Sequence, residues 1–169
     1  MKNNAREPKT VHAYIMAKLF EYGVTISDMA EIVYEEQKKY EPNVTMSYAI
    51  NRVEKVLQKR EVQHAFLVAF FLDESAQNKK MPYPLQLIVE EDRPLFGIDE
   101  QLAMAVSGIY GSIATSNFGW LDKSKKGIIG ILNDGQKYGP GPVTTFLDDM
   151  VAAVIAAAES ATAHDLGSE

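Results

Sequence analysis

Apolar residues recur three and four positions apart along most of the chain, which is the spacing of one face of an α-helix. Several of these runs follow a threonine or serine that can cap a helix: Thr10, Thr25 or Ser27, and Thr45. Over residues 62–73 the stretch is apolar on all sides, which predicts the central core helix. The spacing predicts helices over residues 10–22, 27–40, 45–60, 62–73 and 85–91.

Residues 97–158 show a different pattern. Two pairs of neighbouring acidic residues occur there, and each pair leads into an uncharged run. Asp99 and Glu100 open the first run, and Asp148 and Asp149 open the second, which is rich in alanine. Small residues follow the acids on the same helical face, so the two helices can pack closely along these faces. We therefore expect the carboxylates of the two pairs to lie near one another.

Carboxylates on buried helices are costly unless they are paired, protonated or bound to a cation. Few basic residues lie near these four acids, so the pattern favours a bound cation. Ligands that are all oxygen select a hard ion, with Mg2+ first and Mn2+ or Ca2+ as substitutes. The other interpretation is that the acids stabilise helix N-termini through the helix dipole. Asp99 suits that role after Gly97, whereas the second pair suits it less because Pro142 and Thr144 offer earlier helix starts.

The remaining segments complete an all-α prediction. Five glycines and two prolines between Gly127 and Pro142 predict a flexible or tightly turned connection before the last helix, with a strand or helical turn allowed at residues 128–132. The sequence contains no internal repeat or linker. We expect one compact all-α domain over residues 1–169, with about six or seven helices and not a simple four-helix bundle.

The composition of the chain excludes several classes of partner and of catalytic chemistry. The chain has 169 residues and a net charge of −6, which argues against nucleic acid because phosphate backbones need a basic surface. It has no cysteine, so thiolate nucleophiles and cysteine-based zinc sites are excluded. The longest uncharged run, residues 101–121, is interrupted by Gly, Ser, Thr and Asn and does not favour a membrane span. We expect a cytoplasmic protein with at most peripheral contact at the inner membrane face.

The order of motifs from Ile98 onward resembles the phosphatidylglycerophosphatase A family. The matching motifs are the Asp99–Glu100 pair, Asp122 with Lys125 three positions later, and the run LDDMVAAVIAA that begins at Leu147. The chain lacks the family's spanning helices and its Gly-rich N-terminal segment, and Lys126 replaces the family's proline, so it resembles a soluble branch. The resemblance implies Mg2+-dependent hydrolysis of the phosphate monoester of phosphatidylglycerophosphate, a step of phospholipid biosynthesis, giving phosphatidylglycerol and phosphate.

The resemblance also implies roles for individual residues. The expected metal ligands, for one or two Mg2+ ions, are Asp99, Glu100, Asp148 and Asp149. The expected catalytic residues are Asp122, Lys125 and Asp149. Lys125 would contact the phosphate, and Asp122 would orient Lys125, bind the metal or act as a base. The segment 118–126, with Trp120 and its lysines, would meet the lipid surface.

Two alternatives stay open at this point. One is a Mg2+-dependent hydrolase of a nucleotide or sugar phosphate that uses Glu31, Glu35 and Glu36, although their mixture with lysines is more typical of a solvated face. The other is a non-catalytic helical homo-oligomer whose acid pairs are only caps or ion pairs. The expected partner is accordingly a phosphorylated small molecule or a phospholipid head group.

Overall fold

The computed structural model describes residues 10–95 and 97–166, and all regular secondary structure in these ranges is helical. This confirms the all-α prediction, with nine α-helices and one 3-10 helix in the described ranges against the six or seven helices expected. The elements are α1 (Val11–Glu21), α2 (Ile26–Gln37), α3 (Met46–Leu57), α4 (Arg60–Gln77), α5 (Leu85–Glu90), α6 (Ile98–Ser107), η1 (Gly108–Tyr110), α7 (Gly111–Ser124), α8 (Ile128–Tyr138) and α9 (Leu147–Leu166).

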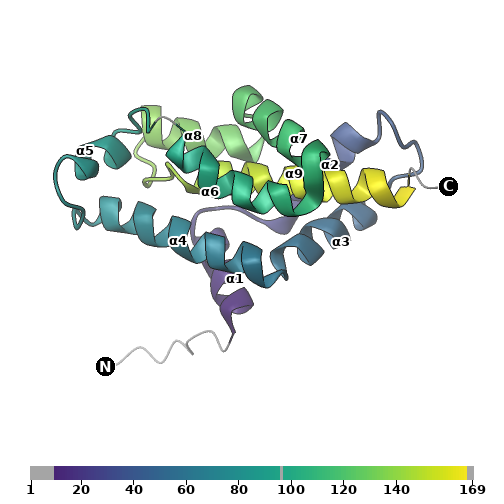
Figure 1. Cartoon of the computed structure of the whole chain (residues 1–169), viewed down its shortest axis with the longest axis horizontal. Coiled ribbons are helices and arrows are strands. Elements are labelled where there is room, and N and C mark those ends of the chain that lie inside the picture. The colour runs from purple at the N-terminus through teal and green to yellow at the C-terminus, as the bar shows by residue number, and fades with distance from the viewer. Residues whose placement is uncertain (1–9, 96, 167–169) are drawn as a thin grey trace.

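Helix α9 is the centre of the fold. It runs lengthwise through the middle of the molecule, with α6 and α7 on one side and α3 and α4 on the other (Figure 1). Every residue from 143 to 160 is buried. The alanines of this stretch allow the neighbouring helices to approach its backbone closely, and residues 150–158 carry no charge, so this part of the helix can be enclosed on all sides.

The prediction that residues 62–73 form the central core helix is wrong. These residues lie in α4, which buries Phe66 and Phe70 but leaves Val68 and Phe71 on its outer face. Phe71 is 69% exposed. An all-apolar run shows that a helix lacks a polar face, but it does not show how many neighbours cover that helix.

The N-terminal caps follow the sequence closely. The side chains of Thr10, Thr25 and Thr45 accept hydrogen bonds from backbone N–H groups three residues later, at 3.1–3.2 Å. The carboxylate of Asp28 in turn accepts a hydrogen bond from the backbone N–H of Thr25, which completes a capping box at α2. Local sequence therefore determines where the first three helices begin.

The predicted connection over residues 127–142 contains an unexpected helix, α8. Its apolar residues Ile128, Ile129 and Leu132 are buried, and this spacing anchors one face of the helix. Gly130 lies within this helix, where a Cβ atom would lie 2.3 Å from the carbonyl oxygen of Lys125. Close packing of α8 against the end of α7 therefore explains this glycine.

The N-terminus of α9 is fixed by residues distant in sequence. The buried carboxylate of Asp73, on α4, accepts hydrogen bonds from the backbone N–H groups of Phe146 and Leu147 at 3.1 and 3.0 Å. Gln136 on α8 accepts a bond from the backbone N–H of Thr144 and donates one to the hydroxyl of Thr145. The helix therefore starts at Leu147, later than the predicted starts.

A second buried carboxylate, Glu159, lies near the middle of α9 and is 2% exposed. Its Oε2 accepts a hydrogen bond from Asn117 Nδ2 at 2.7 Å, while its Oε1 has no partner among the described residues. Burial raises the pKa of this carboxyl to about 8. Because an unfolded chain releases the proton near pH 4.5, the folded state binds more protons between these pH values, and stability falls as pH rises through this window.

We expect Glu159→Gln to remove most of this pH dependence. Glutamine keeps the volume and can still accept the bond from Asn117, but it never ionises. The variant should match the wild type near pH 5 and exceed it by about 2 kcal/mol near pH 9, a shift of several degrees in Tm. Thermal unfolding of both proteins across pH checks this. A variant that is less stable at every pH would contradict it.

Among the described residues, no helix is long and apolar enough to cross a lipid bilayer.

Candidate active site

A cleft of about 470 Å³ opens where the first turns of α6 and α9 meet the last turn of α7. Both acid pairs lie in these first turns, so the expectation that Asp148 and Asp149 suit a helix start less well than Asp99 is wrong. The helix dipoles therefore favour negative charge here. The other residues that line the cleft are Asp92, Arg93, Pro94, Leu95, Gly97, Asp122, Lys123, Lys125, Asn133, Lys137 and Thr145.

Three carboxylates converge at the centre of the cleft. Asp99, Glu100 and Asp149 each offer an oxygen, and these oxygens all lie within 4.8 Å of one another. Asp99 Oδ1 and Glu100 Oε2 are buried and have no hydrogen-bond partner in the part of the chain that the structure describes. Buried acceptors of this kind normally have partners. An all-oxygen set with unused lone pairs fits a hard divalent cation such as Mg2+.

The electrostatics of the cleft agree with this fit. Burial raises the pKa of the Asp99 carboxyl, and its neighbour Glu100 raises it further. Burial and then the charge of Asp148 raise the pKa of Asp149 as well. The clustered carboxylates therefore resist carrying all their charges together, and a cation among them would relieve this repulsion.

Lys125 is the positive centre of the site. Its Nζ lies 2.7 Å from Asp122 Oδ1, 2.9 Å from Asp148 Oδ2 and 3.4 Å from Asp149 Oδ1. Burial lowers its pKa, but the charges of Asp148 and Asp149 outweigh burial and hold the pKa above its ordinary value, so the amine stays protonated.

The backbone at Lys125 supports a role for its side chain. The residue ends α7 in the left-handed conformation, with φ of 46°. Helices that end this way usually have glycine or asparagine at that position, because other side chains are strained there. Local backbone preference does not explain a lysine here, whereas the three carboxylate contacts do.

The predicted site residues form two groups according to the side chains that they contact. Asp99, Glu100 and Asp149 converge, and Asp149 also reaches Lys125. Asp148 was predicted as a metal ligand, but its Oδ1 accepts the backbone N–H of Asp149 and its Oδ2 contacts Lys125. The geometry therefore groups Asp148 with Asp122 as a residue that holds Lys125, and its role as a ligand stays a prediction.

The segment predicted to face lipid, residues 118–126, is mostly the last part of α7 and not a loop. Phe118 is buried, while Trp120 is 49% exposed and lies in a separate pocket with Tyr40 and Glu159. Lys126 forms ion pairs with Glu35 and Glu36 on α2.

The alternative acidic site on α2 receives no support from the geometry. Glu35 and Glu36 are each paired with Lys126 at 2.7 Å, and Glu36 is also paired with Lys39. Over residues 10–95 and 97–166, the group of acids with metal-ligand spacing is the one at Asp99. Glu35 and Glu36 thus belong to an ion-pair network with Lys126 and Lys39.

Sequence reasoning missed several residues of the cleft. Lys137 reaches it from α8 and forms an ion pair with Asp92 at 2.8 Å, and Arg93 enters from the turn before α6. The basic residues offer an anion several positive charges close to the acid cluster. A signal was present in the Asp92-Arg93-Pro94 turn just before the acidic helix, but Lys137 lay in the segment predicted to be a connection.

Comparisons with known proteins agree with these motifs. Residues 14–164 match the family model described as phosphatidylglycerophosphatase A. The chain is 50% identical over 142 residues to YpjQ of Bacillus subtilis (strain 168), which covers 84% of this chain and 78% of YpjQ. It is 46% identical over 154 residues to YutG of the same organism, which covers 91% of each chain. Both relatives are themselves named as uncharacterized proteins.

Solved structures extend the likeness to three dimensions. The crystal structure of ypjQ superimposes with a TM-score of 0.86 at 45% identity, covering 94% of this chain and 96% of that chain. The low temperature requirement C protein of Listeria monocytogenes gives a TM-score of 0.85 at 42% identity, covering 94% and 98%. With a family match over residues 14–164 and relatives of this similarity, the chain belongs to the phosphatidylglycerophosphatase A family.

Proposed function

We propose that the protein is a Mg2+-dependent phosphatase that hydrolyses a phosphate monoester, with phosphatidylglycerophosphate as the substrate class. The observation that supports this most is the convergence of three carboxylates, two with unpaired buried oxygens, beside a protonated lysine in an open cleft. Family membership supports the reaction class. The cleft volume of about 470 Å³ is within the range of small-molecule sites.

Asp99, Glu100 and Asp149 are the residues that would hold Mg2+, with Mn2+ or Ca2+ as substitutes. When bound, the ion would supply positive charge for the non-bridging oxygens of the phosphate. The proposed site thus combines a fixed lysine with a set of oxygen ligands, which are the two kinds of group that phosphoryl transfer requires.

The residues of the chain have distinct roles in this proposal. Lys125 donates one hydrogen bond to the phosphate in place of its 3.4 Å contact with Asp149, while Asp122 and Asp148 hold its side chain in place and keep it charged. Asp149 accepts a proton from the attacking water when its carboxylate is ionised, and a cation bound beside it would favour that form. The hydroxyl of the water adds to phosphorus, the ester P–O bond breaks, and Asp149 passes the proton to the oxygen of the leaving alcohol.

A panel of phosphate esters tests this proposal. We expect phosphate release with Mg2+ from phosphatidylglycerophosphate in mixed micelles, and much less from glycerol 3-phosphate and nucleoside monophosphates. Chelation of Mg2+ should abolish release. Release from soluble esters alone would keep the chemistry but reject the lipid substrate and the expected contact with the inner membrane face. No release from any ester with Mg2+, Mn2+ or Ca2+ would reject the proposal.

We expect Mg2+ to raise the melting temperature of the wild-type protein. A cation that binds only the folded state adds about 2.7 kcal/mol at a concentration one hundred times its Kd. Thermal unfolding in millimolar Mg2+ and in EDTA measures the shift, and Asp149→Asn should reduce it. If Mg2+ does not change the melting temperature, the result would favour the interpretation that the acids serve only as helix caps and ion-pair partners.

A further inference from the structure

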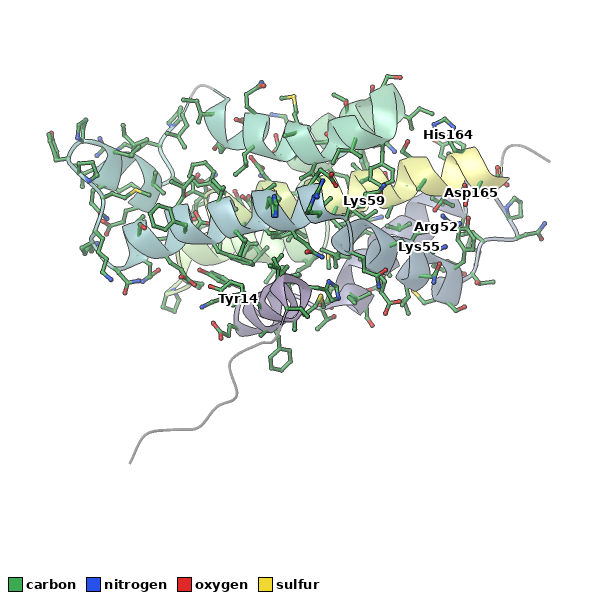
Figure 2. The ribbon with its side chains drawn as sticks, turned by 60° about the horizontal axis from the view of Figure 1, so that its bottom comes forward. Tyr14, Arg52, Lys55, Lys59, His164 and Asp165 are labelled. Carbon is green, nitrogen blue, oxygen red and sulfur yellow. The ribbon has the colours of Figure 1, made fainter. Side chains whose placement is uncertain are left out.

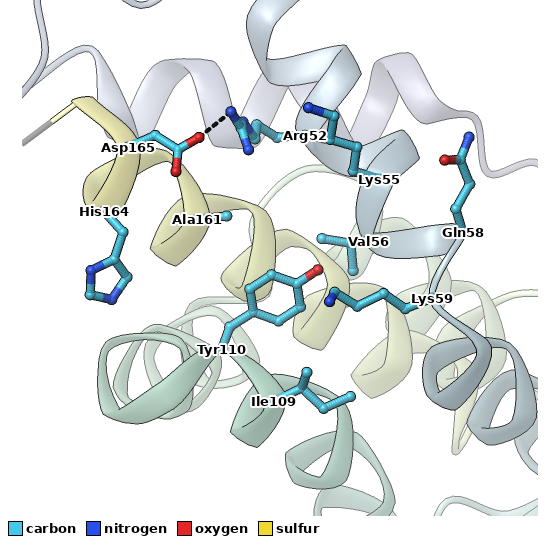
Figure 3. Close-up of a pocket in the computed structure, with 10 residues that line it drawn as sticks. All are labelled: Arg52, Lys55, Val56, Gln58, Lys59, Ile109, Tyr110, Ala161, His164 and Asp165. Atoms are coloured by element: carbon cyan, nitrogen blue, oxygen red, sulfur yellow. Dashed lines mark ion pairs between the residues drawn. The ribbon is translucent and has the colours of Figure 1, made fainter.

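A second pocket, of about 620 Å³, lies at the other end of α9 from the acid cluster. Arg52 and Lys55 reach it from α3, and Lys59 reaches it from the turn after α3. Tyr110 of η1 and the last turns of α9 close the remaining sides (Figure 3). Figure 2 shows Arg52 and Lys55 beside His164 and Asp165 at the end of the molecule where α9 finishes. Twelve residues of α9 separate Ala161 from Asp149, or about 18 Å of helix, so the two sites are distinct.

The pocket is basic, although the chain carries a net charge of −6. Its lining has three side chains of arginine or lysine, Arg52, Lys55 and Lys59, together with His164 and one carboxylate, Asp165. Arg52 forms an ion pair with Asp165, which neutralises one of the three (Figure 3). The buried Nε of Arg52 has no hydrogen-bond partner among the described residues.

Neither of the two lysines has a direct ion-pair partner among the described residues, although the Glu61 carboxylate on α4 offsets part of the charge of Lys59. Lys55 forms no ion pair within residues 10–95 and 97–166, and the same holds for Lys59, whose Nζ lies 5.2 Å from the centre of the Tyr110 ring. In Figure 3 the Lys59 side chain extends across the pocket toward that ring. Two unpaired ammonium groups on one wall match the charge of a phosphate dianion.

Apolar groups line the rest of the pocket. Val56 is buried, Ile109 is 42% exposed, and Tyr110 is half-buried with its ring facing the pocket (Figure 3). The volume falls within the usual range for small-molecule sites. The lining therefore suits an anion that also carries an apolar or planar part, since Tyr110 can pack against such a part while the lysines contact its charge.

We propose that this pocket binds an organic phosphate, with Lys55 and Lys59 contacting the phosphate group and Tyr110 packing against the apolar portion. A soluble nucleotide and an anionic lipid head group share this chemistry. The proposal is independent of the proposed phosphatase activity, because none of these residues belongs to the acid cluster and the test needs no Mg2+.

The first arm of the test uses adenosine 5′-monophosphate as the probe, with adenosine as its uncharged match, in EDTA. Two-dimensional amide NMR of the full chain should show saturable shifts at Lys59, Tyr110 and Ala161 with the nucleotide and not with adenosine. Lys55→Ala/Lys59→Ala should weaken binding about tenfold or more. Both lysines are exposed, so the fold is retained, and Lys38→Ala/Lys80→Ala is the matched control that should bind normally.

The second arm uses vesicles of phosphatidylglycerol in phosphatidylcholine, compared with phosphatidylcholine alone, measured by co-sedimentation. One outcome is that the wild type binds the anionic vesicles, that the Lys55/Lys59 double variant loses this binding, and that the nucleotide causes no response. That combination would identify the lipid head group as the source of the phosphate. Two results would overturn the proposal. One is equal binding of either probe by the wild type and the double variant, and the other is no binding of either probe at millimolar concentration.

Discussion

Replacing Asp149 by asparagine is expected to lower the rate of phosphate release by about a thousandfold. Asparagine keeps the shape of the side chain but loses the charge that would bind Mg2+ and the base that would accept a proton. Asp149 is the member of the acid cluster that reaches both Asp99 and Lys125. Steady-state phosphate release with saturating Mg2+ measures the loss in kcat.

The stability of the same variant without metal separates this role from a structural one. The pKa of Asp149 is raised in the folded state, so its ionisation costs stability as pH rises above the ordinary value for aspartate. Asp149→Asn removes that cost and should be at least as stable as the wild type in EDTA at pH 8. A variant that is active but clearly less stable would mean that Asp149 serves mainly as the ion-pair partner of Lys125.

Replacing Lys125 by methionine should reduce both activity and stability. Methionine keeps the side-chain length and the same backbone strain, so the change isolates the charge. Asp122, Asp148 and Asp149 would lose their shared cation, which should cost about 2 kcal/mol after allowing for partial exposure of the amine. The loss should be larger at pH 8 than at pH 5, because the carboxylates can take up protons at the lower pH. Activity should fall about a hundredfold.

Lys123→Met is the matched control. Lys123 is an exposed lysine two residues earlier on α7 and forms no ion pair in the part of the chain that the structure describes. Its replacement should leave stability within about 0.5 kcal/mol of the wild type. If both variants unfold at the same temperature and retain full activity, Lys125 is not the centre of the site.

The sequence predicted the features that depend on local chemistry. Caps at Thr10, Thr25 and Thr45 follow from hydrogen bonds three residues away, and the two acid pairs stand out because uncharged runs follow them. The motif with Asp122 and Lys125 indicated the family before any geometry was known.

The features it missed depend on contacts between distant segments. Helix α9 begins at Leu147 because Asp73, more than seventy residues earlier, caps it. Spacing alone also could not show that Asp148 turns toward Lys125 while Asp149 joins Asp99. Helix periodicity gives the face of a residue, but only packing determines which neighbours that face meets.

The most direct test of the proposed metal site is a crystal of the protein soaked in Mn2+, with anomalous diffraction used to locate the ion. The proposal predicts a peak bounded by carboxylate oxygens of Asp99, Glu100 and Asp149, and no such peak in crystals of Asp149→Asn. An active protein whose crystals show no anomalous peak at these residues, or a peak only elsewhere, would contradict it.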